Sequence, residues 1–365
     1  MPTIDLIAGA RPNFMKIAPI IEALEKAKAK GSALGWRLVH TGQHYDRRLS
    51  QAFFDELGIP KPHVNLGAGS GTQAEQTAAI MLGYERLLLK EPSHMCMVVG
   101  DVNSTMACAI VARKCGIPVA HVEGGLRSRD WSMPEEINRV VTDSITNWFF
   151  TTTELAGENL RKEGVEEERI FFVGNTMIDS LLKHRHRFRP PEIWQEADLS
   201  PRKYLVLTLH RPSNVDDPGR LEGLLNAITE TSNGMPIIFP VHPRTAKTMA
   251  LLDRRYPDLW CTEPVGYLEF NYLVEHGLGV ITDSGGITEE TTVLGVPCLT
   301  LRENTERPET VTIGTNELVG TDPANVSIAL SPLLSGQWKK GGVPPLWDGK
   351  AAQRIVAILE RLFSV

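Results

Sequence analysis

The sequence predicts an α/β protein in which two doubly wound, Rossmann-like domains face each other across a cleft. Short apolar runs alternate with helical patterns along the chain, which is typical of βαβ units and a mostly parallel sheet. A chain of 365 residues also exceeds the size at which one hydrophobic core stops growing. No period of 20–50 residues repeats, so a solenoid is excluded.

The elements of the first half follow from apolar runs that are rich in β-branched and aromatic residues. These runs predict strands near residues 3–8, 36–41, 96–100, 118–121 and 147–151. Helical periodicity predicts helices between them, at residues 15–30, 72–89, 104–115 and 134–147.

A second series of elements follows, and it begins with a strand near residues 170–173. Further strands are predicted near residues 204–209, 236–240, 279–282 and 297–301. Helices are predicted at residues 176–183, 221–231, 244–256, 267–275 and 286–294. We expect the charged segment 184–200 to be a surface excursion. The expected domains are residues 1–173 and 174–349, with a last helix at 350–365 that packs back on the first domain.

Composition and charge exclude several classes of protein. The net charge of −6 argues against broad binding to nucleic acid or to anionic membranes. No apolar stretch approaches the roughly 18–20 residues of a membrane span. The first nine residues include Asp5 and lack a basic segment, which argues against a signal peptide. Five cysteines without a CxxC pair predict reduced, buried thiols in a cytoplasmic protein.

No cluster has the spacing of a zinc or iron site, and the turn GARPNF lacks the three glycines of a dinucleotide fingerprint. Chemically suggestive turns follow the predicted strands of both halves, and ligands of doubly wound folds bind beyond the carboxyl ends of strands. We expect these turns to line one cleft.

The segment 281–310 reads as a strand, a Ser-Gly-Gly turn and a helix. Such a turn directs backbone N–H groups and the positive end of the helix dipole at one spot, which suits a diphosphate held by Ser284, Gly285 and Gly286. Glu290 lies one turn into the helix, where a carboxylate can accept hydrogen bonds from ribose hydroxyls. The alternative is an ordinary βα turn in which acidic residues stabilise the start of the helix.

Two cations and several carboxylates follow strands of the first half. Arg11 and Lys16 suit a diphosphate, or they are solvated surface cations. Asp101 and Glu123 end apolar strands, and Glu135 and Glu136 open a helix after a proline. We expect these carboxylates to converge on one rim. The alternative is an N-cap for Asp101 and a favourable first helical turn for one of Glu135 and Glu136, and it applies less to Glu123. Arg127 and Arg139 are candidate partners of these acids.

His210 and Arg211 directly follow a strand of the second half, which makes His210 a candidate acid or base. His44 and His242 occupy similar positions, and we favour ligand positioning for them. Arg302 and Arg307, downstream of the predicted cradle, either neutralise a departing diphosphate or pair with Glu303, Glu306 and Glu309.

The ordered set of motifs resembles the non-hydrolysing UDP-N-acetylglucosamine 2-epimerases over residues 3–320. The motifs are GARPNFMK, TGQHYD, GDVNSTMA, HVEGGLRS, MPEEINR, VGNTMIDS, HRPSNVD, VHPRT, DSGGITEE and GVPCLTLRENTERPE. The resemblance implies a GT-B fold, a homodimer and reversible conversion of UDP-N-acetylglucosamine to UDP-N-acetylmannosamine, without NAD or metal.

Site residues are carried over position by position. The catalytic positions of the family match Asp101, Glu123, Glu135 and His210, and Glu135 is chosen over Glu136 because it directly follows the proline. The UDP-binding positions match Arg11, Ser284, Gly285, Gly286 and Glu290, and Lys16 joins them from the reasoning above. The implied chemistry is elimination of UDP to a 2-acetamidoglucal, protonation at C2 from the opposite face and re-addition of UDP.

Two alternative activities and one form of regulation stay open. A hydrolysing 2-epimerase would release UDP and free ManNAc, and a close relative would act on UDP-2,3-diacetamido-glucuronic acid. Some family members are also activated by UDP-N-acetylglucosamine at a second site. Its positions match Gln43, His44, Arg211 and His242, with Arg307 as a further candidate, but Asp46 stands where some of those members have glutamine.

Overall fold

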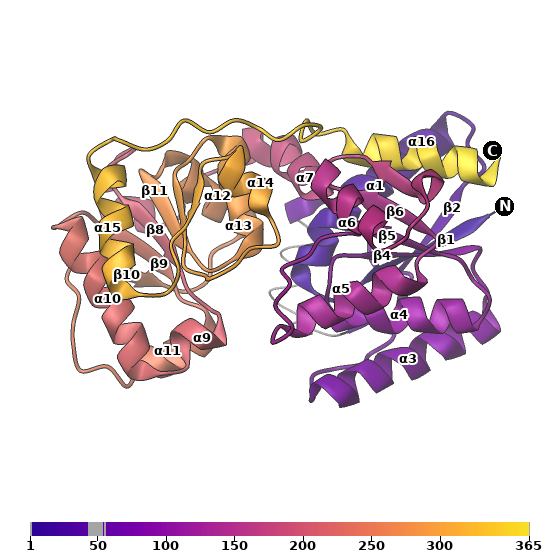
Figure 1. Ribbon diagram of the computed structural model, residues 1–365, viewed down its shortest axis with the longest axis horizontal. Coiled ribbons are helices and arrows are strands. Elements are labelled where there is room, and N and C mark those ends of the chain that lie inside the picture. Colours follow the sequence, from indigo (N-terminus) through magenta and orange to yellow (C-terminus); the bar gives the residue numbers. More distant parts are fainter. Residues whose placement is uncertain (1, 43–53, 55, 365) are drawn as a thin grey trace. The chain divides into compact units, whose positions relative to one another are not determined.

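The chain divides into two compact units, each built around one parallel sheet with helices on its faces (Figure 1). The computed structural model describes residues 2–42, 54 and 56–364, apart from the side chain of Arg11. The first unit consists of Met1–Lys183 and Pro345–Val365, and the second of His184–Pro344.

The first unit alternates strands and helices, as the hydrophobic pattern predicts. Its strands are β1 (Thr3–Ala8), β2 (Gly35–His40), β3 (Val64–Asn65), β4 (Met95–Val99), β5 (Val119–Val122), β6 (Trp148–Thr151) and β7 (Ile170–Phe172). Its helices are α1 (Arg11–Ala29), α3 (Gln73–Lys90), α4 (Asn103–Lys114), α5 (Pro134–Ile145), α6 (Glu154–Lys162), α7 (Thr176–His184) and α16 (Ala351–Phe363). The strand order is β3-β2-β1-β4-β5-β6-β7, and every pairing is parallel.

The second unit repeats this arrangement. Its strands are β8 (Leu205–Thr208), β9 (Ile237–Pro240), β10 (Leu259–Thr262), β11 (Gly279–Thr282), β12 (Cys298–Thr300) and β13 (Asn316–Leu318). Its helices are α8 (Ile193–Glu196), α9 (Pro212–Val215), α10 (Pro218–Ser232), α11 (Pro243–Met249), α12 (Tyr267–His276), α13 (Gly285–Leu294), α14 (Pro308–Thr312) and α15 (Pro323–Leu334). The parallel strands run in the order β10-β9-β8-β11-β12-β13.

Each sheet reverses its order once. The reversal lies between β1 and β4 in the first unit and between β8 and β11 in the second. Loops leave the carboxyl ends of these neighbouring strands in opposite directions, which opens a crevice where ligands of doubly wound sheets bind. The strand order therefore singles out the turns after β1, β4, β8 and β11.

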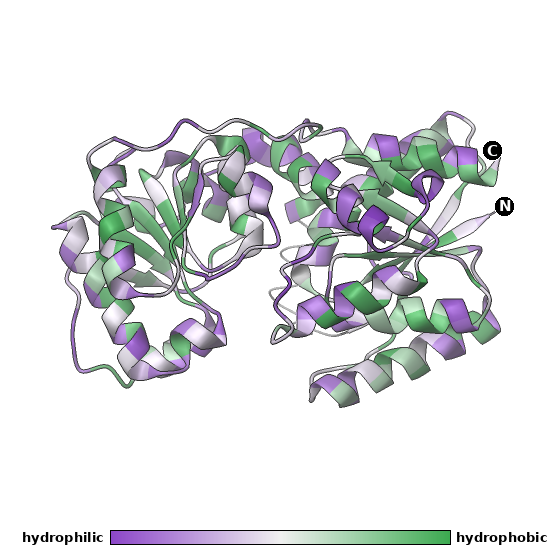
Figure 2. Ribbon diagram, viewed as in Figure 1, coloured by the Kyte–Doolittle hydropathy of each residue, from purple (hydrophilic) through white to green (hydrophobic). Residues whose placement is uncertain are grey.

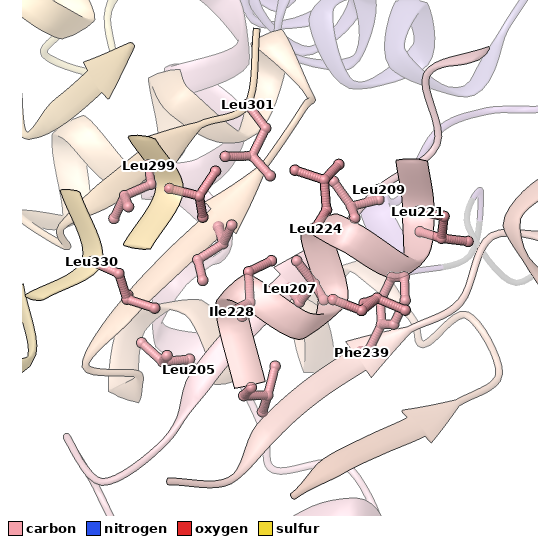
Figure 3. Close-up of a cluster of buried hydrophobic side chains, with 14 of the residues drawn as sticks. Leu205, Leu207, Leu209, Leu221, Leu224, Ile228, Phe239, Leu299, Leu301 and Leu330 are labelled. Carbon is pink, nitrogen blue, oxygen red and sulfur yellow. The ribbon is translucent and has the colours of Figure 1, made fainter. Parts of the chain in front are cut away.

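Apolar side chains fill the space between each sheet and its helices, and Figure 2 shows the strands as the most hydrophobic elements. In the second unit one core cluster joins Leu205, Leu207 and Leu209 to Leu224 and Ile228 of α10 (Figure 3). These side chains are almost completely buried. Burial of each such side chain contributes about 1.5–3 kcal/mol, so the sheets form rigid platforms for their loops.

The unit boundary lies later in the chain than the predicted boundary at residue 174. Strand β7 pairs with β6 of the first sheet rather than beginning the second series. Helix α7 is anchored to the first unit, because the Ser180 hydroxyl donates to the Met15 carbonyl over 2.5 Å. The chain returns at Pro345, and the buried Trp347 indole donates to the Thr152 carbonyl over 3.0 Å. From there α16 packs against α1.

Most predicted elements match the structure within a few residues, and several elements were missed. The unpredicted elements include β3, β10, β13, α6, α8, α9, α14 and α15. The predicted helix at 244–256 ends at Met249. The segment 184–200 is only partly a surface excursion, because Ile193 and Leu199 are buried against Tyr204.

Two further observations concern residue classes. Among the described helices, none combines the length and the apolar composition needed to cross a membrane. All five cysteines are free thiols, but only Cys96, Cys108 and Cys298 are buried. The expectation of buried thiols was therefore wrong for Cys115 and Cys261, which are exposed.

Candidate active site

The turn after β1 is tied to the end of β4 by one buried asparagine. Asn13 accepts hydrogen bonds from the backbone N–H groups of Gly9 and Ala10, over 3.2 and 2.9 Å. Its amide nitrogen donates to the Val99 carbonyl over 3.0 Å. The start of α1 and the residues that follow β4 are thereby held together at the reversal point of the first sheet.

Glu123 and Lys16 form a buried ion pair beside this turn. Lys16 Nζ donates to Glu123 Oε2 over 2.7 Å, and the glutamate is 2% exposed. A methyl group on Gly100 would lie 3.5 Å from Lys16 Nζ and 3.8 Å from Glu123 Oε2. The residue before Asp101 therefore adjoins this pair. Glu123 has a φ of 73°, a left-handed conformation that is unusual for glutamate and typical of strained functional positions.

Asp101 is half-buried and paired with an arginine of α5. Arg139 donates to Asp101 Oδ2 through Nε over 3.0 Å and through Nη2 over 2.7 Å. Arg139 also contacts Glu136, which accepts from the backbone N–H groups of Ser128 and Arg129. Burial opposes ionisation of Glu136, but these N–H groups and Arg139 lower its pKa below the ordinary value.

The two glutamates that open α5 therefore differ in their surroundings. Glu136 is buried in a closed set of hydrogen bonds that shapes the preceding loop. Glu135, the residue chosen from the sequence, is only half-buried. Three of the predicted residues, Gln43, His44 and the side chain of Arg11, lie outside the described part of the chain.

In the second unit, Asp283 joins the ends of β8 and β11. It is fully buried, and its carboxylate accepts from the backbone N–H of His210 over 3.0 Å and of Arg211 over 2.9 Å. Asn214 donates to the same carboxylate over 3.1 Å. Burial works against the charge, but the hydrogen bonds and the charge of His210 lower the pKa of Asp283. The carboxylate is therefore ionised near neutrality.

His210 has one ring nitrogen committed and one available. Its Nδ1 lies 2.7 Å from Asp283 Oδ1 and must carry a proton, because the ionised carboxylate can only accept. This leaves Nε2 for proton transfer or for a ligand, and the side chain is 43% exposed. The ring of His242 lies 5.9 Å away. Burial, with the charges of His210 and Arg244, lowers the pKa of His242.

The predicted cradle lies at the start of α13. Ser284 is the N-cap residue but makes no side-chain cap, and its backbone N–H donates to Thr282 Oγ1 over 2.9 Å. A methyl group on Gly285 would lie 2.5 Å from Glu306 Oε1, so a larger residue there would displace this carboxylate. Glu306 in turn accepts from Arg302 over 2.7 Å. Arg302 therefore forms one of the acid pairs that the sequence left open.

The two glutamates of α13 are buried and do not lie in its first turn. Glu289 accepts from Arg307 Nε over 2.5 Å, so Arg307 pairs with this residue rather than with the three acids considered from the sequence. Tyr267 donates to Glu290 Oε1 over 2.9 Å. Burial raises the pKa of Glu290 to about 7, and the charge of Glu289 adds to the rise.

The structure thus gathers the predicted residues at the carboxyl edge of each sheet. Sequence reasoning missed the residues that hold them, above all Asp283, Asn214 and Tyr267. Asp283 was open to prediction, because it directly follows an apolar strand and precedes the Ser-Gly-Gly turn. No local signal identifies Tyr267 as a partner of Glu290, since the two residues lie on different helices.

Known proteins are similar to this chain in fold and in sequence over almost their whole length. The family model described as UDP-N-acetylglucosamine 2-epimerase matches residues 26–360. A UDP-N-acetylglucosamine 2-epimerase of Methanocaldococcus jannaschii is 43% identical over 98% of both chains. A UDP-2,3-diacetamido-2,3-dideoxy-D-glucuronate 2-epimerase of Pseudomonas aeruginosa is 38% identical over 98% of this chain and 99% of its own.

The solved structures agree. A crystal structure of the Methanocaldococcus jannaschii UDP-GlcNAc 2-epimerase, in complex with UDP-GlcNAc and UDP, has a TM-score of 0.88 and 42% identity. It matches 98% of this chain and 99% of its own. The predicted GT-B-like α/β class is confirmed by these neighbours. The chain is an enzyme that belongs to the UDP-N-acetylglucosamine 2-epimerase family.

Proposed function

We propose that this enzyme reversibly converts UDP-N-acetylglucosamine to UDP-N-acetylmannosamine without net hydrolysis. Two observations together support the proposal. A relative that is similar over its full length is named for this activity, and Asp101 and Glu123 lie at the carboxyl ends of strands in the first unit. The proposal requires one substrate molecule to contact residues of both units.

The chemistry of the substrate explains why such a site needs several carboxylates. The C2 proton lies beside an amide nitrogen rather than a carbonyl, so its direct removal would leave an unstabilised carbanion. Departure of UDP from C1 first, or at the same time, creates an oxocarbenium-like centre and makes the C2 proton acidic. Loss of that proton gives a 2-acetamidoglucal and UDP. Protonation at C2 from the other face and re-addition of UDP at C1 complete the inversion.

In this proposal the first unit transfers the protons. Asp101, Glu123 and Glu135 are the candidate groups, and proton transfer to opposite faces of C2 calls for more than one of them. The ion pair with Lys16 holds the Glu123 carboxylate in one place over 2.7 Å. Arg139 does the same for Asp101. Because these carboxylates are already held in place, no free energy is needed to orient them during the reaction.

The second unit is proposed to bind UDP and to stabilise its departure. The N–H groups of Gly285 and Gly286 and the Ser284 hydroxyl face the diphosphate, because the Ser284 N–H already donates to Thr282. The α13 dipole favours the negative charge of the diphosphate. His210 Nε2 is placed by Asp283 to donate to the leaving oxygen or to a phosphate. Glu290 binds the ribose hydroxyls, and Arg11 and Lys16 stay predicted ligands of the diphosphate.

The decisive experiment is incubation with UDP-N-acetylglucosamine in D₂O, followed by proton NMR. We expect the manno product to appear with deuterium at C2. Asp101→Asn and Glu123→Gln should abolish deuterium incorporation while UDP still binds. Glu158→Gln, an exposed change on α6, serves as the matched control and should incorporate deuterium normally. Retained exchange in both active-site variants would show that these residues are wrongly assigned.

The nucleotide half is tested separately by Gly285→Ala. The added methyl group would lie 2.5 Å from Glu306 Oε1, so this carboxylate, which Arg302 holds, must move and UDP affinity should fall at least tenfold. The control is Gly223→Ala on α10, where the methyl group would meet Pro323 at an ordinary 3.4 Å. Isothermal titration with UDP compares the two variants. Equal affinities would exclude Gly285 from the diphosphate site.

One alternative substrate has specific support. The 38% identical relative from Pseudomonas aeruginosa acts, by its name, on UDP-2,3-diacetamido-2,3-dideoxy-D-glucuronate. Side-by-side kcat/KM measurements with the two UDP-sugars decide between them. A hydrolysing enzyme would instead release UDP and free ManNAc, which the same NMR spectra resolve.

The cytoplasmic location stays a prediction. The implied homodimer stays a prediction that analytical ultracentrifugation tests.

Activation by a second UDP-N-acetylglucosamine is also left as a prediction, and we expect it to be absent. The reverse reaction, started from UDP-N-acetylmannosamine alone and with a trace of UDP-N-acetylglucosamine, tests it. A lag that the trace removes would reverse our expectation and would implicate Arg211, His242 or Arg307.

A further inference from the structure

A completely buried histidine lies behind the proposed proton-transfer residues. His121 is the third residue of β5, and none of its surface is exposed. Its Nδ1 lies 2.7 Å from Asp143 Oδ1, and its Nε2 lies 2.8 Å from the backbone carbonyl oxygen of Gly100. Both ring nitrogens are thus within hydrogen-bond distance of oxygen atoms.

Neither of these oxygens can donate a proton when Asp143 is ionised. A backbone carbonyl only accepts, so Nε2 must carry a hydrogen. The Asp143 carboxylate also accepts from the Gly125 N–H over 3.0 Å and from Arg127 Nη1 over 2.7 Å. Arg127 and the Gly125 N–H, which both donate to Asp143, favour its ionised form without any contribution from His121. An ionised carboxylate only accepts, so a hydrogen bond from Nδ1 requires a hydrogen there as well, which makes the ring an imidazolium.

The charges around the ring are balanced by short-range pairs. Asp143, from α5, lies between His121 and Arg127. Arg127 also pairs with Glu163 over 2.5 Å, so the second cation has its own carboxylate. On the Gly100 side, the ion pair of Lys16 and Glu123 lies next to Gly100. A buried cation is tolerated only in such a compensated setting.

The hydrogen bonds of the network end on the backbone of both proton-transfer turns. His121 fixes the carbonyl of Gly100, which has a φ of +67° and directly precedes Asp101. Asp143 fixes the N–H of Gly125, two residues after the strained Glu123. The two turns leave neighbouring strands β4 and β5. The ring and its carboxylate therefore join them through one rigid connection.

We propose that His121 is a doubly protonated positioning residue, which links the Gly100–Asp101 turn to the Glu123–Gly125 turn and so orients the groups that move the C2 proton. The role in catalysis rests on the proposed function, whereas the protonation state does not. His121 touches no substrate in this proposal. A neutral ring would lose one of its two hydrogen bonds and loosen one turn.

The protonation state is tested directly in the wild-type enzyme by ¹⁵N NMR of histidine-labelled protein between pH 7 and 8. We expect both ring nitrogens of His121 to have attached protons and similar shifts. His40 is the internal control, because it is also buried and its Nδ1 accepts from the Gly42 N–H over 2.7 Å. Burial lowers its pKa, so it should show one bare nitrogen. A bare nitrogen on His121 would overturn the proposal.

Two substitutions separate the two hydrogen bonds. In His121→Gln the amide nitrogen replaces Nε2 and keeps the bond to Gly100. In His121→Asn it replaces Nδ1 and keeps the bond to Asp143. We expect both to lower kcat roughly 10- to 100-fold, as small misplacements of reacting groups do, with KM for the UDP-sugar nearly unchanged. The glutamine variant should retain more activity, because it preserves the link next to Asp101. Folded variants with wild-type kcat would refute the positioning role.

The two readouts keep the failures distinguishable. If the wild-type enzyme does not epimerise the sugar but His121 has two protons, the proposed function fails and the protonation state stands. If the enzyme is active and His121 has one proton, the further inference fails alone. Should neither variant fold, the NMR measurement on the wild-type protein still decides. The loss of signals in either folded variant assigns the His121 resonances.

Discussion

Glu309 offers a quantitative test of the electrostatics of the second unit. It lies in the first turn of α14 and is only 7% exposed. Neither carboxyl oxygen makes a hydrogen bond of ordinary geometry within the described part of the chain. Burial raises its pKa from 4.5 to about 7, and the nearby charges of Glu289 and Glu306 add to the rise while Arg307 opposes it. We therefore consider the isosteric change Glu309→Gln.

The size of the effect follows from the shift in pKa. The folded state binds a proton at Glu309 up to pH 7, whereas the unfolded chain releases it near pH 4.5, so stability falls as the pH rises through that window. At about 1.4 kcal/mol per pKa unit, the loss is roughly 3 kcal/mol by pH 8. Glutamine has no proton to lose. The variant should be more stable than the wild type by roughly 3 kcal/mol at pH 8 and by under about 1 kcal/mol at pH 4.5.

Urea unfolding monitored by circular dichroism at pH 4.5, 6 and 8 measures this difference. Thermal unfolding provides a second measure, because 1 kcal/mol corresponds to roughly 2–4 °C in a domain of 150–250 residues. Glu263→Gln, a change at an exposed residue of the same unit, is the control and should alter stability by less than about 0.5 kcal/mol at each pH. A stability difference for Glu309→Gln that does not depend on pH would refute the reasoning.

Two further substitutions test the packing around Gly125 and the role of Asp283 in the site. Gly125→Ala would bring a methyl group to 2.3 Å from the Ala156 carbonyl at a φ of +83°, so we expect a loss of roughly 2–5 kcal/mol in thermal unfolding. Gly116→Ala, with φ +74° and open space, should lose only about 1–2 kcal/mol, and equal losses would contradict the clash. In Asp283→Asn, the new side-chain N–H donor would face backbone N–H donors, which should lower the free energy of unfolding by roughly 1–3 kcal/mol. It should also remove most of the kcat that depends on His210, and an unchanged kcat would show that this pair is dispensable.

The sequence predicted the fold class because hydrophobic periodicity is local. Strands such as β4 and β8 are largely apolar runs, and the helices between the strands repeat apolar residues at helical spacing. Short edge strands were missed, since β3 and β13 contain only two and three residues. The unit boundary was placed too early because it depends on which unit α7 packs against. The hydrogen bond from Ser180 to Met15 joins residues 165 positions apart, and such long-range packing is not contained in periodicity.

The chain by itself determined which residues stand at the carboxyl ends of its strands, and that placed Asp101, Glu123 and His210 in the two crevices. Only the tertiary structure decided the partners. Lys16 meets Glu123 across 107 positions of the chain, and His210 meets Asp283 across 73. Such pairs form because parallel strands distant in sequence become neighbours, and their end loops then share one buried volume. Buried charges must be paired, so the order of the strands in each sheet decides which charged side chains become partners.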